Sequence, residues 1–333
     1  MNQKIITYDY LKQFKRIHVK ITDNLFDKIK NKILEKYGSL RGYNKILKIE
    51  YPTLKWEFRN NIYHPFYRLL EIIQHIDINK DEFYHNIIGF YHWGSHNKNY
   101  SKIPKEIEIN EQFVEGYALY LAEGDTGFNG KTIPRKLRFT NSDINVINHF
   151  IKWLNNLSLN KEFYVNAIFP KNIESNPRNL TKQIKCNKIN LTSDSYNRIV
   201  KYRICTDSAI LIDLILAINE RIKEICVTDK NLAKAYIRGM MIGEGTAYFN
   251  KSRYVRIEMK NEKEIKYIHK LFTLLDFECK PSLRPERENM WSIYIGAKQL
   301  GNYKDLIGFR IHEKRQKIQD MAVNKKLRVN QYK

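Results

Sequence analysis

Two glutamates, Glu123 and Glu244, each end an apolar segment of the sequence and are each followed by glycine. The first segment reads FVEGYALYLAEGDTGF (113–128) and the second reads AYIRGMMIGEGTAYF (235–249). Their apolar character predicts a helix up to each glutamate. The C-terminal end of a helix carries about half a unit of negative charge, so a carboxylate in this place favours a bound cation.

Small residues recur at a spacing of four within both predicted helices. Ala118 and Ala122 stand in the first helix, and Gly239 and Gly243 stand in the second. Glycine inside a helix costs about 1 kcal/mol relative to alanine, so we look for a packing role. A flat stripe of small residues lets two helix backbones approach closely. We therefore expect the two helices to pack against each other in parallel.

This packing would bring Glu123 beside Glu244. Two carboxylates at two negative helix ends repel each other unless a cation is present. Mg²⁺, or Mn²⁺ in its place, suits such a site, because hard divalent ions take oxygen ligands and keep several waters. The metal could activate water and stabilise the leaving 3′ oxygen in phosphodiester hydrolysis.

An internal repeat surrounds the two glutamates. Beyond each Glu-Gly the sequence predicts two strands, a helix, two strands and a helix, so each half reads αββαββα. The predicted fold class is α+β, with pseudo-symmetric halves over 111–228 and 229–333, the second ending in a basic helix and tail. Four apolar positions recur at an offset of 121 residues: Ile144, Ile147, Ile151 and Leu154 match Ile265, Ile268, Phe272 and Leu275.

The predicted strands alternate between apolar and polar residues, which indicates sheets with one covered and one open face. The open faces are rich in Lys and Arg, and two of them would form a saddle that fits a groove of double-stranded DNA. The alternative is an ordinary solvated sheet face, which also carries lysine. The residues expected to contact DNA from these faces are Lys136, Arg138, Lys201, Arg203, Arg256 and Lys260.

Residues 1–100 are expected to form an all-α domain. A periodic helix over 24–36 ends at Gly38, and Ser39 can cap a second helix. Pro52 stands where the first position of a third helix belongs, because its missing N–H costs nothing there. Residues 94–110, polar and broken by glycine and proline, are the expected linker to the rest of the chain.

The second and third of these helices resemble a helix-turn-helix. If they are one, Thr53 and Lys55, together with Tyr51, face the DNA. An inert helical domain shows the same pattern and is the alternative.

The whole chain is strongly basic: its 333 residues include 58 Lys and Arg against 36 Asp and Glu, a net charge of +22. Nucleic acid is the usual partner of such a surplus, an anionic membrane surface is a competitor, and a lysine-rich organism is a third explanation. No apolar run approaches the roughly 18 residues of a membrane span, so no membrane insertion is expected. Four scattered cysteines without a CxxC spacing favour a reducing cytoplasm.

The segments around the two glutamates resemble the motif of the LAGLIDADG, or DOD-type, homing endonucleases. IRGMMIGEG (237–245) fits the nine-residue motif with Gly third, an acid eighth and Gly ninth. YALYLAEGD (117–125) fits when Glu123 takes the acidic place, with Ala118 instead of the usual glycine. Both copies lack the acid that is often sixth. The resemblance covers 111–320.

The resemblance implies a site-specific DNA endonuclease that works as a single-chain pseudo-dimer, and thus as a monomer, without a small-molecule cofactor. The two glutamates would hold the metal, two asparagines would order water, and a basic residue would lie near the scissile phosphate. Arg315 is the alternative to Lys314 in that last role, and Lys223 is a candidate in the first half. The implied catalytic residues are Glu123, Glu244, Asn141, Asn261 and Lys314.

Two other functions stay open. Degenerate copies of this fold serve as non-cleaving transcription regulators, and some members of the family are maturases that act in RNA splicing. Metal-dependent nicking separates an endonuclease from a regulator, and preference for structured RNA separates a maturase from both.

Overall fold

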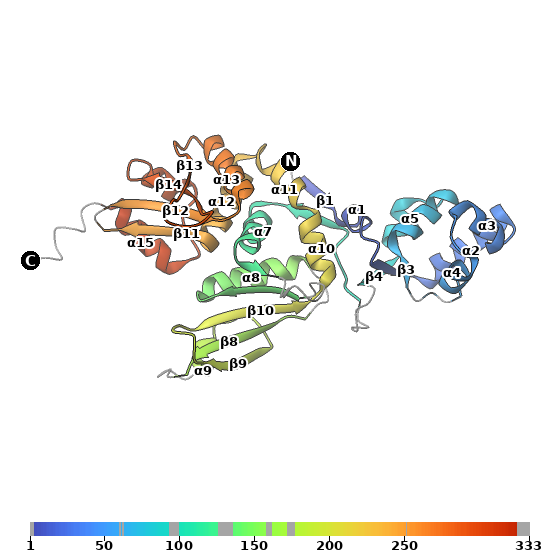
Figure 1. Cartoon of the computed structure of the whole chain (residues 1–333). Helices are drawn as coiled ribbons and strands as arrows, with labels where there is room; N and C mark the ends of the chain where they lie inside the picture. The colour runs from blue at the N-terminus through green and yellow to red at the C-terminus, as the bar shows by residue number, and fades with distance from the viewer. Residues whose placement is uncertain are drawn as a thin grey trace, which may run out of the picture.

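The computed structural model describes residues 3–59, 61, 63–92, 100–125, 136–157, 162–171, 177–250 and 252–324. Helices alternate with mainly antiparallel sheets, which confirms the α+β class (Figure 1). The N-terminal helices lie at one end of the molecule and the C-terminal strands at the other. Among the described residues no helix is long and apolar enough to span a membrane.

The expectation of an all-α N-terminal domain is wrong. Three strands, β2 (Ile17–Ile21), β3 (His64–Pro65) and β4 (Ile87–His92), form an antiparallel sheet in the order β3-β2-β4. Strand β2 alternates strictly, with Ile17, Val19 and Ile21 fully buried. Its partner β4 lies some 70 residues further along the chain. A strand of five residues gives only a short alternating pattern, and nothing in that pattern indicates a partner so far along the chain. The sequence therefore did not predict this sheet.

The predicted N-terminal helices are confirmed. Helix α2 (Asp23–Tyr37) ends at Gly38, whose φ of 72° suits glycine. Helix α3 (Leu40–Leu47) begins at Ser39, whose hydroxyl accepts a hydrogen bond from the Gly42 N–H at 3.0 Å. Pro52 lies in the first turn of α4 (Tyr51–Glu57). The other helices of this region are α1 (Thr7–Leu11), α5 (Phe66–His75) and α6 (Lys80–His85).

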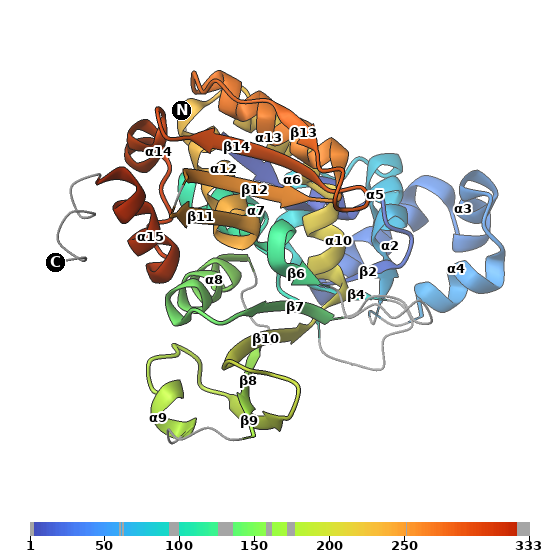
Figure 2. The ribbon, with the colours of Figure 1, turned by 60° about the vertical axis from the view of Figure 1, so that its left-hand side comes forward.

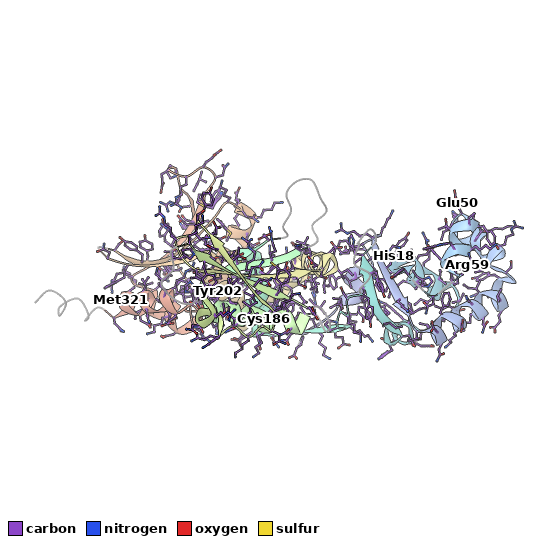
Figure 3. The ribbon with its side chains drawn as sticks, turned by 90° about the horizontal axis from the view of Figure 1, so that it is seen from below. His18, Glu50, Arg59, Cys186, Tyr202 and Met321 are labelled. Carbon is purple, nitrogen blue, oxygen red and sulfur yellow. The ribbon has the colours of Figure 1, made fainter. Side chains whose placement is uncertain are left out.

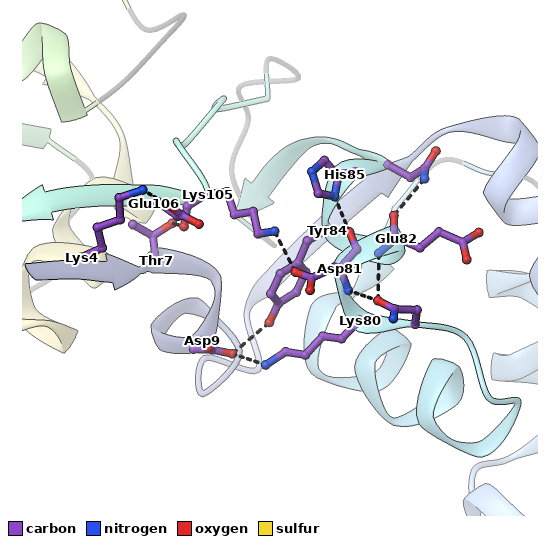
Figure 4. Close-up of polar contacts among 12 residues, drawn as sticks. Lys4, Thr7, Asp9, Lys80, Asp81, Glu82, Tyr84, His85, Lys105 and Glu106 are labelled. Atoms are coloured by element: carbon purple, nitrogen blue, oxygen red, sulfur yellow. Dashed lines mark hydrogen bonds and ion pairs between the residues drawn. The ribbon is translucent and has the colours of Figure 1, made fainter.

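The segment expected to be a linker is structured at its end. Strand β5 (Glu106–Ile109) pairs with β1 (Gln3–Ile6), while residues 93–99 lie outside the described part of the chain. Polar contacts join this two-stranded sheet region to α6 (Figure 4). Lys105 pairs with Asp81 at 2.8 Å, and Asp9 accepts from Lys80 at 2.7 Å and from the Tyr84 hydroxyl at 3.0 Å. The segment around β5 is thus tied back to the N-terminal region by a strand pair and ion pairs.

His64 makes the N-terminal region sensitive to acid. Its side chain is 1% exposed and lies near the rings of Phe26 and Phe58, and burial lowers its pKa to about 4. The unfolded chain, with a histidine pKa of about 6.5, binds more protons between pH 6.5 and 4, so stability falls as the pH falls through this window. Complete protonation through this window lowers the free energy of unfolding by about 3 kcal/mol, which is the energy equivalent of the shift in the His64 pKa from 6.5 to about 4. Urea unfolding from pH 7 to 4.5 should show a smaller loss for His64→Phe than for the wild type, whereas His85→Gln, at an exposed position, should follow the wild type.

The first half is built on a five-stranded sheet in the order β6-β7-β10-β8-β9, with β9 parallel to β8. Helix α9 and strand β9 are additions to the expected αββαββα pattern. Strand β9 is largely exposed, so it lacks the alternation of apolar and polar residues from which a strand is predicted. The elements are α7 (Glu111–Glu123), β6 (Gly124–Asp125), β7 (Lys136–Asn141), α8 (Ile144–Leu157), β8 (Tyr164–Pro170), α9 (Pro177–Thr181), β9 (Ile189–Asp194), β10 (Lys201–Asp207), α10 (Ala209–Ala217) and α11 (Asn219–Cys226).

The second half contains a four-stranded antiparallel sheet in the order β11-β12-β14-β13. Its last helix, α15, lies against β11 (Figure 2). The elements are α12 (Lys230–Glu244), β11 (Gly245–Phe249), β12 (Arg253–Met259), α13 (Glu262–Leu274), β13 (Pro281–Leu283), β14 (Trp291–Gly296), α14 (Leu300–Leu306) and α15 (Glu313–Val323).

Candidate active site

Helices α7 and α12 touch through their small residues, as expected. A Cβ atom placed on Gly239 would lie 2.3 Å from the Glu115 carbonyl oxygen and 2.8 Å from the Ala118 Cβ. One placed on Gly243 would lie 2.4 Å from the Ala122 Cβ. Real Cβ contacts are longer than this, so only glycine permits the observed approach of the two backbones.

Both helices end at their glutamates. Asn110 caps the start of α7 through the Phe113 N–H, and Asp229 caps α12 through the N–H groups of Asn231 and Leu232. At the other ends, Gly124 and Gly245 have extended backbones, so the chain passes directly into β6 and β11. Each glutamate is therefore the last residue of its helix.

A buried ion pair also joins the two helices. Arg238, 4% exposed, donates to Glu115, 6% exposed, at 2.7 Å and to the Ile307 carbonyl at 2.9 Å. The ring of His149 lies 3.4 Å from the second Glu115 oxygen, and burial lowers the pKa of that histidine. The sequence analysis missed this network, although opposite charges inside two apolar segments were a signal for it. Breaking a buried pair is costly, so the network favours one register of the helices.

The pKa values of the two carboxylates at the helix ends are both raised. Glu123 is half-buried, and its pKa rises to about 7 through burial and then through the charge of Glu244, with Arg315 acting in the opposite direction. The pKa of Glu244 is also raised by loss of hydration, although the residue as a whole is exposed, and Arg315 again opposes the shift. Negative charge at this point therefore lacks full compensation.

These residues suit a divalent ion held partly by other ligands. The described residues include no group of three or more His, Cys, Asp or Glu side chains that could hold a metal. Two carboxylates fit Mg²⁺ or Mn²⁺ when waters and substrate phosphates complete the coordination. The donor set favours this fit, since two carboxylates end two helices whose backbones are in close contact.

The two asparagine side chains accept from backbone N–H groups near the starts of helices. The Asn141 side-chain oxygen accepts from the Asp143 N–H at 2.9 Å, just before α8, and that of Asn261 accepts from the Glu264 N–H at 3.2 Å at the start of α13. In the described part of the chain no hydrogen bond joins either asparagine to Glu123 or Glu244. A role in ordering water would thus fall to the amide nitrogens.

The two candidate basic residues near the C-terminus differ. Lys314 is exposed. Arg315 turns to α12, where its guanidinium donates to the carbonyl of Met241 at 3.0 Å, to that of Ile242, and to that of Gly243 at 3.1 Å. Lys223 pairs with Glu264 at 2.6 Å, which engages the candidate of the first half.

Cations on the sheet of the first half are paired with neighbours. Arg138 donates to Asp125 at 2.6 Å, and Lys136 lies 3.7 Å from Asp207. Arg203 donates to the Thr140 hydroxyl at 3.2 Å, and Lys201 is half-buried. This face therefore carries less free positive charge than its sequence indicates.

The sheet of the second half has a tyrosine-lined face. Arg256 pairs with Glu258 at 2.9 Å, lies over the rings of Tyr254 and Tyr294, and donates to the Tyr294 hydroxyl at 3.1 Å. Tyr248 stacks on Tyr254 with ring centroids 4.9 Å apart. Lys260 is exposed.

Thr53 and Lys55 are exposed on α4, at the end of the molecule opposite the second half. Figure 3 shows Glu50 and Arg59, which flank α4, far from Met321 on α15. Leu47 and Leu54 are buried. Trp56, also on α4, is 58% exposed.

No family model and no curated protein matches the chain. Among solved structures, I-DmoI in complex with DNA and Mn is 14% identical, with a TM-score of 0.38, over 60% of this chain and 97% of that one. The homing endonuclease I-WcaI bound to its DNA recognition sequence is 12% identical, with a TM-score of 0.41, over 62% and 86%. The N-terminal LAGLIDADG domain of WhiA is 14% identical, with a TM-score of 0.36, over 60% and 82%. At these values the likeness is distant, and the site is interpreted from its own geometry.

Proposed function

We propose that this chain is a metal-dependent endonuclease that hydrolyses double-stranded DNA at a specific site, in the manner of a LAGLIDADG homing endonuclease. The observation that carries the proposal is the pair Glu123 and Glu244 at the ends of two helices in backbone contact, with the pKa of Glu123 raised to about 7. Negative charge gathered at such close range is suited to a divalent cation.

The two halves are proposed to be a pseudo-symmetric pair. The orders β6-β7-β10-β8 and β11-β12-β14-β13 correspond strand by strand, with β9 added at one edge. In each half the sheet comes directly after a helix whose last residue is a glutamate and whose next residue is glycine. A monomer built in this way would place one sheet on each half of a long DNA site.

In the proposed mechanism Glu123 and Glu244 would hold the metal. A bound divalent ion would supply an activated water and charge stabilisation for the leaving 3′ oxygen. The amide nitrogens of Asn141 and Asn261 orient water, and the exposed Lys314 reaches a phosphate. Thr53 and Lys55 on α4 read DNA outside the cleaved region.

Cleavage of a plasmid library that carries randomised inserts, with Mg²⁺ and with EDTA, tests the proposal. Linear or nicked product that depends on the metal and on a subset of inserts is expected. Failure to cleave any member, combined with tight binding to duplex DNA, would favour the second candidate, a non-cleaving transcription regulator. The exposed Thr53, Lys55 and Trp56 on α4 are the observation in its favour.

DNA affinity should fall steeply with salt, because phosphate contacts release counterions. With 6–10 such contacts, roughly 10³–10⁵ in affinity is lost between about 50 and 200 mM salt. Lys260→Gln should reduce the slope of log K against log salt by about one. Lys266→Gln removes the same charge from α13, which packs on the other side of the sheet, and should leave the slope unchanged. A nearly flat salt dependence of the wild type would contradict the basic binding surface.

A further inference from the structure

The start of α15 is fixed to the first half of the chain. Asp143 uses one carboxylate oxygen to cap α8, accepting from the Asn145 N–H at 2.9 Å. Its other oxygen accepts from the Glu313 N–H at 3.2 Å and lies 3.2 Å from the His312 ring. One aspartate therefore holds the first turns of two helices, one from each half.

Arg315, in the same first turn of α15, reaches the second half. Its guanidinium donates to the carbonyl oxygens of Met241, Ile242 and Gly243, in the last turn of α12. The last carbonyls of a helix have no partner within the helix and form its negative end. Gly243 is also the residue that contacts Ala122 on α7, so the guanidinium lies where the two helix ends meet.

The same guanidinium lies close to both carboxylates, because Gly243, whose carbonyl accepts from it, directly precedes Glu244, and a Cβ placed on Gly243 would lie 3.0 Å from the Glu123 Cγ. Its positive charge favours the charged form of each carboxylate, which burial disfavours, and the charge of Glu244 also disfavours the charged form of Glu123. Burial lowers the pKa of Arg315, and the negative charge of Glu123 is the largest of the contributions that oppose this shift. Because arginine keeps its charge in proteins, this compensation is permanent, unlike that of an exchangeable ion.

We propose that Arg315 is a positioning residue that serves as a built-in counter-cation for the Glu123 and Glu244 carboxylates and keeps the two helix ends together before a divalent ion binds. This inference rests on the proposed function only in taking that pair as the metal site. It differs from a plain helix cap, which would act on α12 without regard to the charge of Glu123.

Melting temperatures at pH 8 test the inference. In EDTA, Arg315→Met should lower the melting temperature by on the order of 10 °C, because a buried cation and its hydrogen bonds are lost. Mn²⁺ should then raise the melting temperature of Arg315→Met more than that of the wild type, since the metal replaces the missing charge. Arg315→Lys, which keeps the charge but not the forked donors, should show the wild-type response to Mn²⁺.

A second variant separates the charge role from capping. If Arg315 balances the carboxylates, Arg315→Met should cost less in a Glu123→Gln background, in EDTA, than in the wild type. Equal costs in both backgrounds would overturn the inference, as would a Mn²⁺ stabilisation that is present in both Arg315→Met and the wild type and equal in size. Should Arg315→Met alone fail to fold, recovery of a folded protein by adding Glu123→Gln supports the inference, and failure of the double variant overturns it.

The matched control is Arg253→Met. Arg253 donates to the Ala322 carbonyl at 3.0 Å, at the other end of α15, and so provides a similar contact away from the carboxylates. Its removal should lower the melting temperature without changing the Mn²⁺ response or the effect of Glu123→Gln. If Mn²⁺ shifts no variant at all, the metal site and the proposed function fail, while the EDTA comparison still decides the role of Arg315.

Discussion

Glu123→Gln and Glu244→Gln are each expected to abolish DNA cleavage while DNA binding is retained. Each change removes the charge of a proposed metal ligand and keeps the shape of the side chain. A metal ion contributes several kcal/mol of transition-state stabilisation, so the cleavage rate should fall by about 10³-fold or more. Single-turnover cleavage and a binding titration in Ca²⁺ measure the two quantities separately.

Glu111→Gln is the control for this pair of variants. Glu111 lies in the first turn of α7, at the opposite end of the same helix from Glu123, and is exposed. Its loss should leave the cleavage rate close to that of the wild type. Wild-type rates for both Glu123→Gln and Glu244→Gln would mean that the metal assignment is wrong.

Gly243→Leu is expected to destabilise both halves of the chain together. A Cβ on Gly243 would lie 2.4 Å from the Ala122 Cβ and 3.0 Å from the Glu123 Cγ, so a larger side chain must push α7 and α12 apart. Overpacking of this kind costs about 1–3 kcal/mol, occasionally more. The same displacement separates Glu123 from Glu244, so cleavage activity should fall further than stability does.

Thermal melts and nicking rates of this variant are compared with those of Gly301→Leu. Gly301 lies in α14, and a Cβ there meets no atom within 4 Å, so the same substitution meets no obstacle. An unchanged melting temperature and full activity of Gly243→Leu would contradict the close helix contact on which the site depends.

Features with local causes could be predicted from the sequence. Gly38 ends α2, Ser39 caps α3 and Pro52 lies in the first turn of α4, because each acts on backbone groups within a few residues. The contact of α7 with α12 was predictable for a related reason. Glycine lowers the stability of a helix, and close packing offsets this loss. Gly239 and Gly243 therefore indicated which face of α12 contacts α7.

The N-terminal sheet and strand β9 escaped prediction because their signals are weak or distant. Strand β2 pairs with a segment some 70 residues away, and neither strand has a turn that links it to the other. Strand β9 is exposed on most of its length and pairs in parallel with β8, so no alternation marks it.

By itself the sequence determined the two glutamates, the helices that carry them and the excess of positive charge. Only the tertiary structure decided which charges are free. Arg138 pairs with Asp125, Arg256 with Glu258, and Arg315 turns to the end of α12 while its neighbour Lys314 stays exposed. The reason is physical: a backbone pattern follows from neighbouring residues, whereas the partner of a long charged side chain depends on what the fold brings within about 4 Å of it.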